Sequence, residues 1–261
     1  MSALDTWTRG SHTYDGTTHP TYRKGSGPGV VVIHEIPGMT PDVITFGDEV
    51  AAAGFTVVMP HLFGDLEAPG TVKQVAKVLP KLCVNKEFTK LALQETTPVA
   101  GWLRSLARGL HGELGGPGVG ALGMCVTGGV ALAMMVDDSV AAPVLCQPSA
   151  PFAVGKRRAA DLNLSPADLE VVKRRAAQDC SVLWLQYSKD PATGTRFDTL
   201  RHELGENFVA VEFEGRGHAT VTEHRQQEAV DRILAFFAER LASTPGGPST
   251  RSRPSRVRVL G

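Results

Sequence analysis

A cysteine stands in a glycine-rich stretch, GMCVTGG at residues 123–129, that could expose a nucleophile. An apolar run precedes it and a helical pattern follows, which is the strand–turn–helix context of a nucleophile elbow. A thiol there lies beside a helix N-terminus, where the helix dipole and free amides favour a thiolate. The stretch departs from the G-x-S-x-G pattern, because Thr127 replaces the second glycine. Buried cysteine is also a common core residue, so the stretch alone leaves a structural and a catalytic Cys125 equally open.

Two residues further along the chain fit the acid and the base of a triad. Asp190 follows the apolar run VLWLQY, and His218 follows FVAVEF in the glycine-rich EGRGHAT. Nucleophile, acid and histidine occur in this order in α/β-hydrolase triads. A loop histidine is usually solvated and an aspartate before proline usually begins a turn. Their joint occurrence in the right order favours a Cys125–His218–Asp190 triad, with the Val126 amide as one oxyanion donor.

Glu35 closes the first predicted core strand, in VVVIHEIPGM, beside the loop expected to carry a second oxyanion donor. A carboxylate near a thiol would be partly desolvated and could exchange a proton with it. The alternative is a surface glutamate at a strand terminus. His61 also follows a strand end and is a candidate pocket residue. His34 and Glu35 lack the second histidine of H-E-x-x-H, so we expect no metal.

Short apolar runs alternate with longer helical patterns along the chain. The predicted strands are Val30–His34, Phe55–Met59, Val119–Gly123, Val140–Cys146, Val182–Tyr187 and Phe208–Phe213. The predicted helices are Pro41–Ala53, Glu87–Leu110, Thr127–Val136, Pro166–Gln178, Arg196–Gly205 and Glu223–Ala242. This alternation predicts an α/β fold, with a mostly parallel central sheet and helices on both faces. Sites in such sheets form beyond the carboxyl ends of the strands, where the candidate residues fall.

The length of 261 residues suits one large domain, which we place at residues 29–242. An N-terminal segment, residues 1–28, precedes it. The tail at residues 243–261 is rich in Ser, Pro, Gly and Arg and has no apolar period. Such a composition predicts disorder, although the arginines could contact an acidic partner.

Composition excludes several classes of partner. The 27 basic and 27 acidic residues balance, so nothing favours nucleic acid or an anionic membrane.

The four scattered cysteines form no C-x-x-C pair, which predicts neither a zinc site nor a disulfide framework. Free thiols and the lack of an apolar leader region indicate a cytoplasmic protein. The uncharged run Val119–Val136 is long enough to span a membrane, but its glycines favour a buried strand turning into a helix.

Four motifs, VVVIHEIPG, GMCVTGG, YSKD and GRGHA, together resemble the dienelactone hydrolase (carboxymethylenebutenolidase) family. This is a cysteine-using branch of the α/β-hydrolase superfamily, and the resemblance spans roughly residues 29–237. It implies a Cys125–His218–Asp190 triad and an oxyanion hole formed by the Ile36 and Val126 amides. The resemblance also implies that Glu35 bonds the resting thiol until substrate displaces it.

The activity implied is hydrolysis of a small ester or lactone through an acyl-enzyme intermediate, without a cofactor. We expect a monomer or a homodimer. The family archetype holds its substrate's carboxylate with two arginines, and this sequence departs from both. Thr222 stands where one is expected, with Arg225 a helical turn further on. The other position offers Lys81 and Lys86 but no arginine, and Arg216 beside the histidine could substitute. Another lactone, an ester or a thioester therefore fits as well as dienelactone.

Two other interpretations keep the fold but change the function. Cys125 could be the reactive thiol of a non-catalytic binding or redox-sensing protein, with Cys146 as the resolving partner. Alternatively, the same nucleophile could serve a thioesterase or an acyltransferase.

Overall fold

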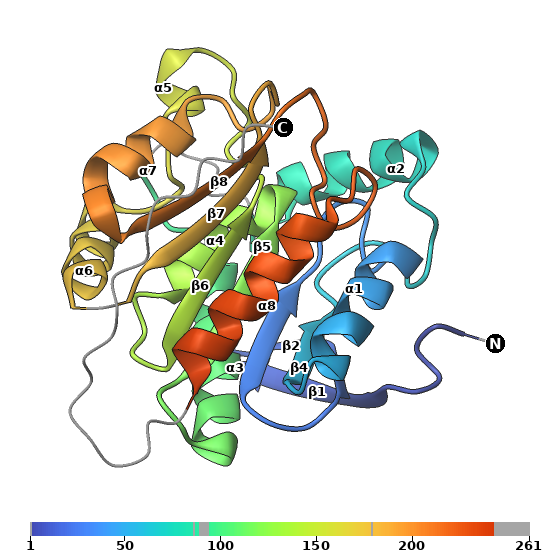
Figure 1. The fold of residues 1–261 in the computed structure, drawn as a ribbon. Coiled ribbons are helices and arrows are strands. Elements are labelled where there is room, and N and C mark those ends of the chain that lie inside the picture. Colours follow the sequence, from blue (N-terminus) through green and yellow to red (C-terminus); the bar gives the residue numbers. More distant parts are fainter. Residues whose placement is uncertain (1, 86, 89–93, 179, 243–261) are drawn as a thin grey trace.

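The computed structural model describes residues 2–85, 87–88, 94–178 and 180–242. Within them, one eight-stranded sheet has the order β1-β2-β4-β3-β5-β6-β7-β8 (Figure 1). The strands are β1 (Thr8–Tyr14), β2 (Thr17–Lys24), β3 (Gly29–Ile33), β4 (Thr56–Pro60), β5 (Val119–Met124), β6 (Val140–Cys146), β7 (Val182–Tyr187) and β8 (Phe208–Phe213). β1 and β2 pair antiparallel at one edge, and the other strands run parallel. The predicted mostly parallel sheet is confirmed.

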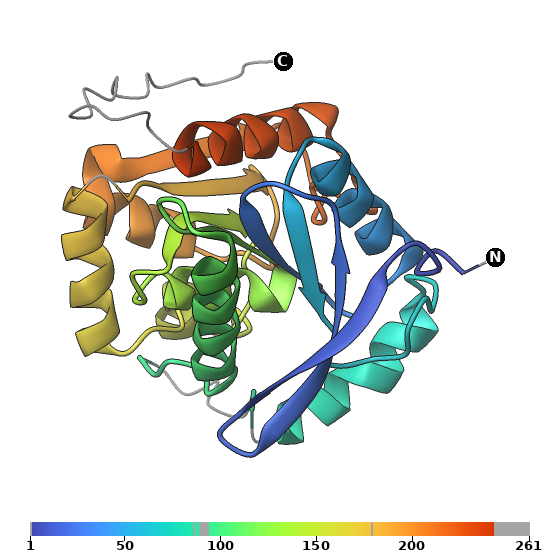
Figure 2. The same cartoon turned by 90° about the horizontal axis from the view of Figure 1, so that it is seen from below.

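Helices cover both faces of the sheet. They are α1 (Pro41–Ala52), α2 (Val72–Val84), α3 (Val99–Leu114), α4 (Gly128–Met134), α5 (Lys156–Ala159), α6 (Pro166–Ala177), α7 (Arg196–Leu204) and α8 (Gln227–Leu241), with short 3₁₀ turns η1 (Cys125–Thr127) and η2 (Gly205–Asn207). α1 and α8 pack on one face, and α2, α3, α4, α6 and α7 contribute to the core on the other. Figure 2 shows this separation, with the red α8 and blue α1 opposite the green α3.

Alternate residues of the central strands are buried in two different cores, as the two-residue period of a strand requires. In β3, Val30 lies in the core beneath α1 and α8, whereas Val31 lies in the core on the opposite face. Helix α8 packs closely against β5. A Cβ added at Gly120 would lie 2.7 Å from Cε1 of Phe237 in α8, so the absence of a side chain permits this packing.

The structure differs from the predicted elements mainly near the N-terminus and before α3. Residues 1–28, predicted as a separate segment, supply β1 and β2 of the sheet. The helix predicted from Glu87 covers residues 89–93, which lie outside the described residues. Within the described part of that stretch α3 begins at Val99, because Pro98 precedes it and disfavours helical backbone in the residue before itself. α2 was not predicted, since Pro80 lies in its interior.

The apolar run at residues 119–136 is divided between β5, η1 and α4, so its hydropathy is that of a buried strand turning into a buried helix. No helix in the described part of the chain is long and apolar enough to cross a membrane. The tail predicted to be disordered, residues 243–261, lies outside the described residues.

Candidate active site

Cys125 stands at a sharp turn where β5 ends and η1 begins, and its φ is +52°. This left-handed backbone is uncommon for residues other than glycine, and a strained turn of this kind presents the nucleophile in an elbow. The neighbouring glycines leave the room it needs. A Cβ at Gly123 would lie 2.2 Å from the carbonyl oxygen of Thr127, and one at Gly128 would lie 2.8 Å from Cα of Pro148. The chain therefore forms a strained elbow despite its departure from the usual pattern.

Thr127 occupies the position of the missing elbow glycine without strain, because its φ of −96° and ψ of −5° are helical. Its hydroxyl accepts a hydrogen bond from the Met124 amide at 3.0 Å. The same oxygen lies 3.2 Å from the Ile33 carbonyl and 3.1 Å from the His34 carbonyl. A glycine would make none of these contacts, so Thr127 ties the elbow to the end of β3.

His218 and Asp190 come from loops beyond β8 and β7, respectively, and meet above the same edge of the sheet. Nδ1 of His218 lies 2.6 Å from Oδ2 of Asp190, whose side chain is 2 % exposed. The Ala192 amide donates to the other oxygen of this carboxylate at 2.9 Å, which fixes its orientation. Burial lowers the pKa of His218, but its hydrogen bonds to Asp190 and to the Cys125 thiol outweigh burial and raise the pKa to about 10.

The thiol has a second partner that the sequence analysis did not predict. Sγ of Cys125 lies 3.1 Å from Oγ of Ser149, and the Ser149 amide donates to the Cys125 carbonyl at 2.9 Å. Ser149 is buried and follows the carboxyl end of β6, next to β5. A hydroxyl beyond a neighbouring strand end is the signal that could have pointed to it.

Glu35 is buried beside the triad, and both oxygens of its carboxyl group are hydrogen-bonded. Oγ1 of Thr222 donates to Oε1 at 2.5 Å, and Nε2 of Gln147 donates to Oε2 at 3.4 Å. Burial raises the pKa of Glu35, although these bonds and the charge of His218 oppose the rise. Glu35 is not among the described partners of the Cys125 thiol. The structure thus differs from the resting contact that the family resemblance implied.

Gln147 joins Glu35 to the loop that carries the histidine. It is fully buried at the end of β6 with a φ of +36°. Its Oε1 accepts from the Thr220 amide at 3.2 Å and from the Thr220 hydroxyl at 2.8 Å. Since Thr220 is two residues after His218, this side-chain bridge connects the end of β3, the end of β6 and the histidine loop. The sequence analysis did not predict it.

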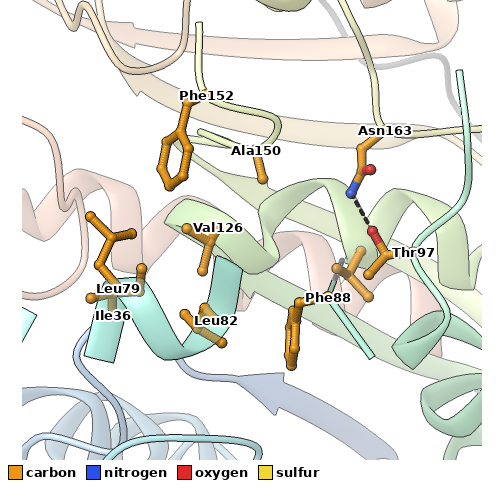
Figure 3. A pocket seen from close by; sticks show the side chains of 10 residues that line it. Ile36, Leu79, Leu82, Phe88, Thr97, Val126, Ala150, Phe152 and Asn163 are labelled. Atoms are coloured by element: carbon orange, nitrogen blue, oxygen red, sulfur yellow. Dashed lines mark hydrogen bonds between the residues drawn. The ribbon is translucent and has the colours of Figure 1, made fainter. Parts of the chain in front are cut away.

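The residues whose amides were predicted to form the oxyanion hole, Ile36 and Val126, line one pocket. Val126 lies in the first turn after the elbow, where amides have no acceptor within the helix. The hollow measures about 410 Å³, counting space open to solvent. Its other lining residues are Leu79, Leu82, Phe88, Thr97, Val130, Ala150, Phe152 and Asn163 (Figure 3).

Comparisons with known proteins show the family of the chain. A family model described as the dienelactone hydrolase family matches residues 17–240. The chain belongs to the dienelactone hydrolase family. No curated protein gives a significant match. Family membership makes the chain a hydrolase, and it supports carboxylic ester hydrolysis as the class of reaction.

Three solved structures show the shared α/β-hydrolase fold. Dienelactone hydrolase from Anabaena variabilis has a TM-score of 0.63 and 13% identity, covering 90% of this chain and 98% of its own. A dienelactone hydrolase-like promiscuous phosphotriesterase from metagenomic libraries has a TM-score of 0.59 and 15% identity, covering 91% and 99%. A cold-adapted esterase from an Arctic intertidal metagenomic library has a TM-score of 0.59 and 17% identity, covering 88% and 93%.

The residues expected in place of the family's two arginines lie elsewhere or have other partners. Thr222 bonds the Glu35 carboxyl group, as described above. Arg225 is exposed and pairs with Glu49 at 2.8 Å. Arg216 is also exposed, directly before the loop glycine that precedes His218.

Two further candidate binding residues, Lys81 and His61, are not among those that line the pocket. Lys81 is exposed on α2, and Lys86 lies outside the described residues. The half-buried ring of His61 directs Nε2 toward the Gly64 carbonyl at 3.1 Å.

His34, weighed above as a metal ligand, uses both ring nitrogens within the protein. Nδ1 lies 3.1 Å from the Glu35 carbonyl, and Nε2 accepts from the Leu62 amide at 3.0 Å. Burial lowers the pKa of His34 to about 3, which keeps the ring neutral. Among the described residues, no group of three or more His, Cys, Asp or Glu side chains is placed to hold a metal ion.

Cys146, considered above as a resolving cysteine, is fully buried at the end of β6. Burial raises the pKa of its thiol, against the effect of a hydrogen bond with Thr220. A thiol held protonated in this way is a poor nucleophile for disulfide exchange.

Proposed function

We propose that this protein hydrolyses a small ester or lactone, with Cys125 as nucleophile and His218 and Asp190 completing the triad. The contact of His218 with Asp190 carries the proposal: Nδ1 of His218 lies 2.6 Å from Oδ2 of Asp190, and interaction with the Cys125 thiol at the strained elbow contributes to the raised pKa of the histidine. A nucleophile bonded to a base, with the base oriented by a third group, is the arrangement that covalent catalysis requires.

In this proposal His218 holds a proton and Cys125 acts as the thiolate. The sulfur attacks the ester carbonyl carbon, and a carbon–sulfur bond forms as the carbonyl oxygen becomes an oxyanion. The amides of Ile36 and Val126 donate hydrogen bonds to that oxyanion. The tetrahedral intermediate collapses by breaking the bond to the leaving oxygen, which takes the proton from His218.

Hydrolysis of the thioester returns the site to its starting state. His218, now neutral, removes a proton from water as the water oxygen attacks the acyl carbon. Collapse of the second tetrahedral intermediate releases the carboxylic acid and restores the Cys125 thiolate beside protonated His218. Asp190 keeps the imidazole oriented in both half-reactions.

Glu35 acts in this proposal through the loop that carries the base. Glu35 accepts a hydrogen bond from Thr222, which lies on that loop, and another from Gln147, which itself bonds Thr220 of the loop. Its charge also interacts with His218. Glu35→Gln is therefore expected to displace His218 and slow catalysis, while Cys125 stays in place.

The deciding experiment removes the thiol. We expect Cys125→Ala to abolish turnover of an activated aryl ester and of a simple lactone, without changing the circular dichroism spectrum. Cys180→Ala is the matched control, because Cys180 precedes β7 at the opposite end of the strands. This control is expected to keep wild-type turnover.

Mass spectrometry of the quenched reaction tests the intermediate. We expect the acyl mass to be added to the peptide containing Cys125, and to be absent from Cys125→Ala. Turnover that survives in Cys125→Ala would refute the proposed nucleophile. A Cys125 that is readily alkylated without any lactone, ester or thioester being turned over would support the binding or sensing alternative instead.

A further inference from the structure

The pocket described above lies next to the elbow, because Val126, the residue directly after Cys125, is part of its wall. Its wall includes Ile36 and Val126, the two residues assigned to the oxyanion hole, and Ala150, which follows the thiol's partner Ser149. A group attached to a carbonyl carbon bonded to Cys125 would therefore enter this hollow.

The lining also indicates which half of the substrate enters. None of the three triad residues lines the pocket, but Val126 next to Cys125 does, whereas no described residue of the loops that carry His218 and Asp190 is in its wall. Because His218 delivers a proton to the leaving oxygen, the leaving group lies on the histidine side of the carbonyl. The acyl group then occupies the opposite side, beside the oxyanion amides, where the pocket lies.

The walls of the pocket are apolar. Leu79 and Leu82 come from α2, Val130 from α4 and Phe152 from the loop after β6, and Figure 3 shows Leu79, Leu82 and Val126 grouped around the same space. No charged side chain lines it among the described residues. An ionised carboxylate entering it would lose its water without gaining a cation from the described lining, which is strongly unfavourable.

One end of the pocket is polar. Nδ2 of Asn163 donates to Oγ1 of Thr97 at 2.7 Å, and this pair lies at one end of the hollow (Figure 3). Oδ1 of Asn163 is buried and has no hydrogen-bond partner among the described residues. An alkyl chain long enough to reach Asn163 would contact this oxygen without offering it a hydrogen bond. Methylene groups beyond that length therefore add no further binding free energy.

We propose that this pocket binds the acyl group of the substrate, and that the acyl group is uncharged and apolar. The inference rests on the proposed function and narrows it to neutral, lipophilic esters and lactones. It differs from the carboxylate-bearing substrates implied by the family archetype, whose two arginines are missing from this sequence.

The first test compares aryl esters that share one leaving group. We expect kcat/KM to rise up to roughly fourfold for each methylene added from acetyl to butyryl, since each buried methylene contributes about that factor. The rise is expected to stop for longer chains. The carboxylate-ended succinyl ester, similar in length to the butyryl ester, is expected to be at least tenfold poorer than it.

The second test adds a cation to the pocket wall. We expect Leu79→Arg to lower kcat/KM for the butyryl ester and raise it for the succinyl ester. Val72→Arg is the matched control, because Val72 is 86 % exposed on the same helix and receives the same charge. This control should keep the wild-type preference. Leu79→Ala, which adds no charge, should weaken the butyryl preference without improving the succinyl ester.

The outcomes separate this inference from the proposed function. If no ester shows turnover that depends on Cys125, the proposed function fails. If turnover depends on Cys125 but the wild type prefers the succinyl ester, only the acyl-pocket inference is overturned. Equal effects of Leu79→Arg and Val72→Arg would also overturn it, because the charge would then act at long range and not inside the pocket.

Discussion

Cys125 combines a strained backbone with a thiol that has two partners. A non-glycine residue in the left-handed region costs on the order of 1 kcal/mol or more, and such positions persist only where the surroundings hold them. Here the surroundings are the tight contacts around Gly123 and Gly128 and the hydroxyl of Thr127. Ser149 contacts the sulfur at 3.1 Å, and the turn exposes the thiol beyond the carboxyl end of β5, where the proposed reaction would take place.

The pH profile of catalysis tests the contact between His218 and Asp190. His218 must carry a proton to the leaving group, so activity should fall on the alkaline side as its raised pKa, about 10, is passed. Asp190→Asn removes the carboxylate that helps raise this pKa, and the alkaline fall should move to lower pH. We expect turnover at pH 9 to drop on the order of tenfold beyond any loss seen at pH 7.

The measurement is kcat against pH, corrected for spontaneous hydrolysis, with Asp198→Asn as control because Asp198 is an aspartate of the exposed part of α7. An alkaline limb at the same pH in wild type and Asp190→Asn would show that Asp190 does not set the proton affinity of His218.

The sequence allowed a site residue to be predicted where that residue closely follows an apolar strand. Asp190 and His218 each follow an apolar strand, and such residues meet at one edge of a parallel sheet. Gln147 and Ser149 also follow a strand, but the positive φ of Gln147 turns the chain inward there. Nothing in the local pattern shows that turn, so the contacts of Gln147 could not be predicted, whereas the position of Ser149 beyond a strand end was a usable signal.

At the scale of elements, the junction of β3, β5 and α4 carries Ile36 and Val126, whose amides are proposed to form the oxyanion hole. The Thr127 side chain is the link, since it contacts the Met124 amide on one side and the carbonyls at the end of β3 on the other. The Thr127 hydroxyl therefore adds to the β3–β5 ladder a side-chain link between the end of β3 and the elbow.

Replacing this hydroxyl tests the link. Thr127→Val keeps the shape of the side chain but leaves the buried Met124 amide without its acceptor, which should cost roughly 1–3 kcal/mol in the free energy of unfolding. We expect kcat to fall more than KM changes, because the oxyanion hole acts mainly on the transition state. Urea unfolding and steady-state kinetics provide both quantities.

Thr127→Ser is the matched variant, since it retains the hydroxyl. It should stay near wild type in stability and in kcat. A Thr127→Ser variant as impaired as Thr127→Val would mean that the methyl group and its packing, and not the hydrogen bonds, hold the elbow.

The central strands were predictable because they are uninterrupted apolar runs, whereas the edge strands β1 and β2 are largely polar and partly exposed. A local signal for this hairpin was present. Asp15 and Gly16 lie between the two strands with φ of +48° and +74°, and an Asp-Gly pair is the preferred turn of a two-residue hairpin. The alternation of the flanking residues is too weak to reveal a strand unless that pair is taken into account.

Across the whole molecule, one buried arginine joins the loops around the site. The guanidinium of Arg196 donates to the carbonyls of Pro148, Asp161 and Ala192 at 2.9–3.1 Å, with further bonds to Pro151 and Arg158. Burial lowers the pKa of Arg196 to about 10, so it stays charged at neutral pH. These carbonyls belong to the segments that carry Ser149, the pocket wall and Asp190.

We expect Arg196→Met to lower the free energy of unfolding by roughly 3–5 kcal/mol, because several buried carbonyls lose their donor at once. Arg196→Lys should be intermediate, since an ammonium cannot reproduce the planar fork of donors. Guanidinium unfolding followed by tryptophan fluorescence measures both variants. Stability of Arg196→Met within experimental error of wild type would show that water or neighbouring groups replace the guanidinium.

The close packing of Phe237 on Gly120 has a consequence for how the protein is made. β5 carries the nucleophile at its end, yet one of its faces is covered by α8, which follows every other described strand and helix in the chain. A ribosome therefore synthesises Cys125 long before it synthesises the helix that seals the strand beneath it. A nascent chain lacking α8 would expose the apolar face of the strand that carries Cys125, so this part of the core can be completed only after α8 has been synthesised.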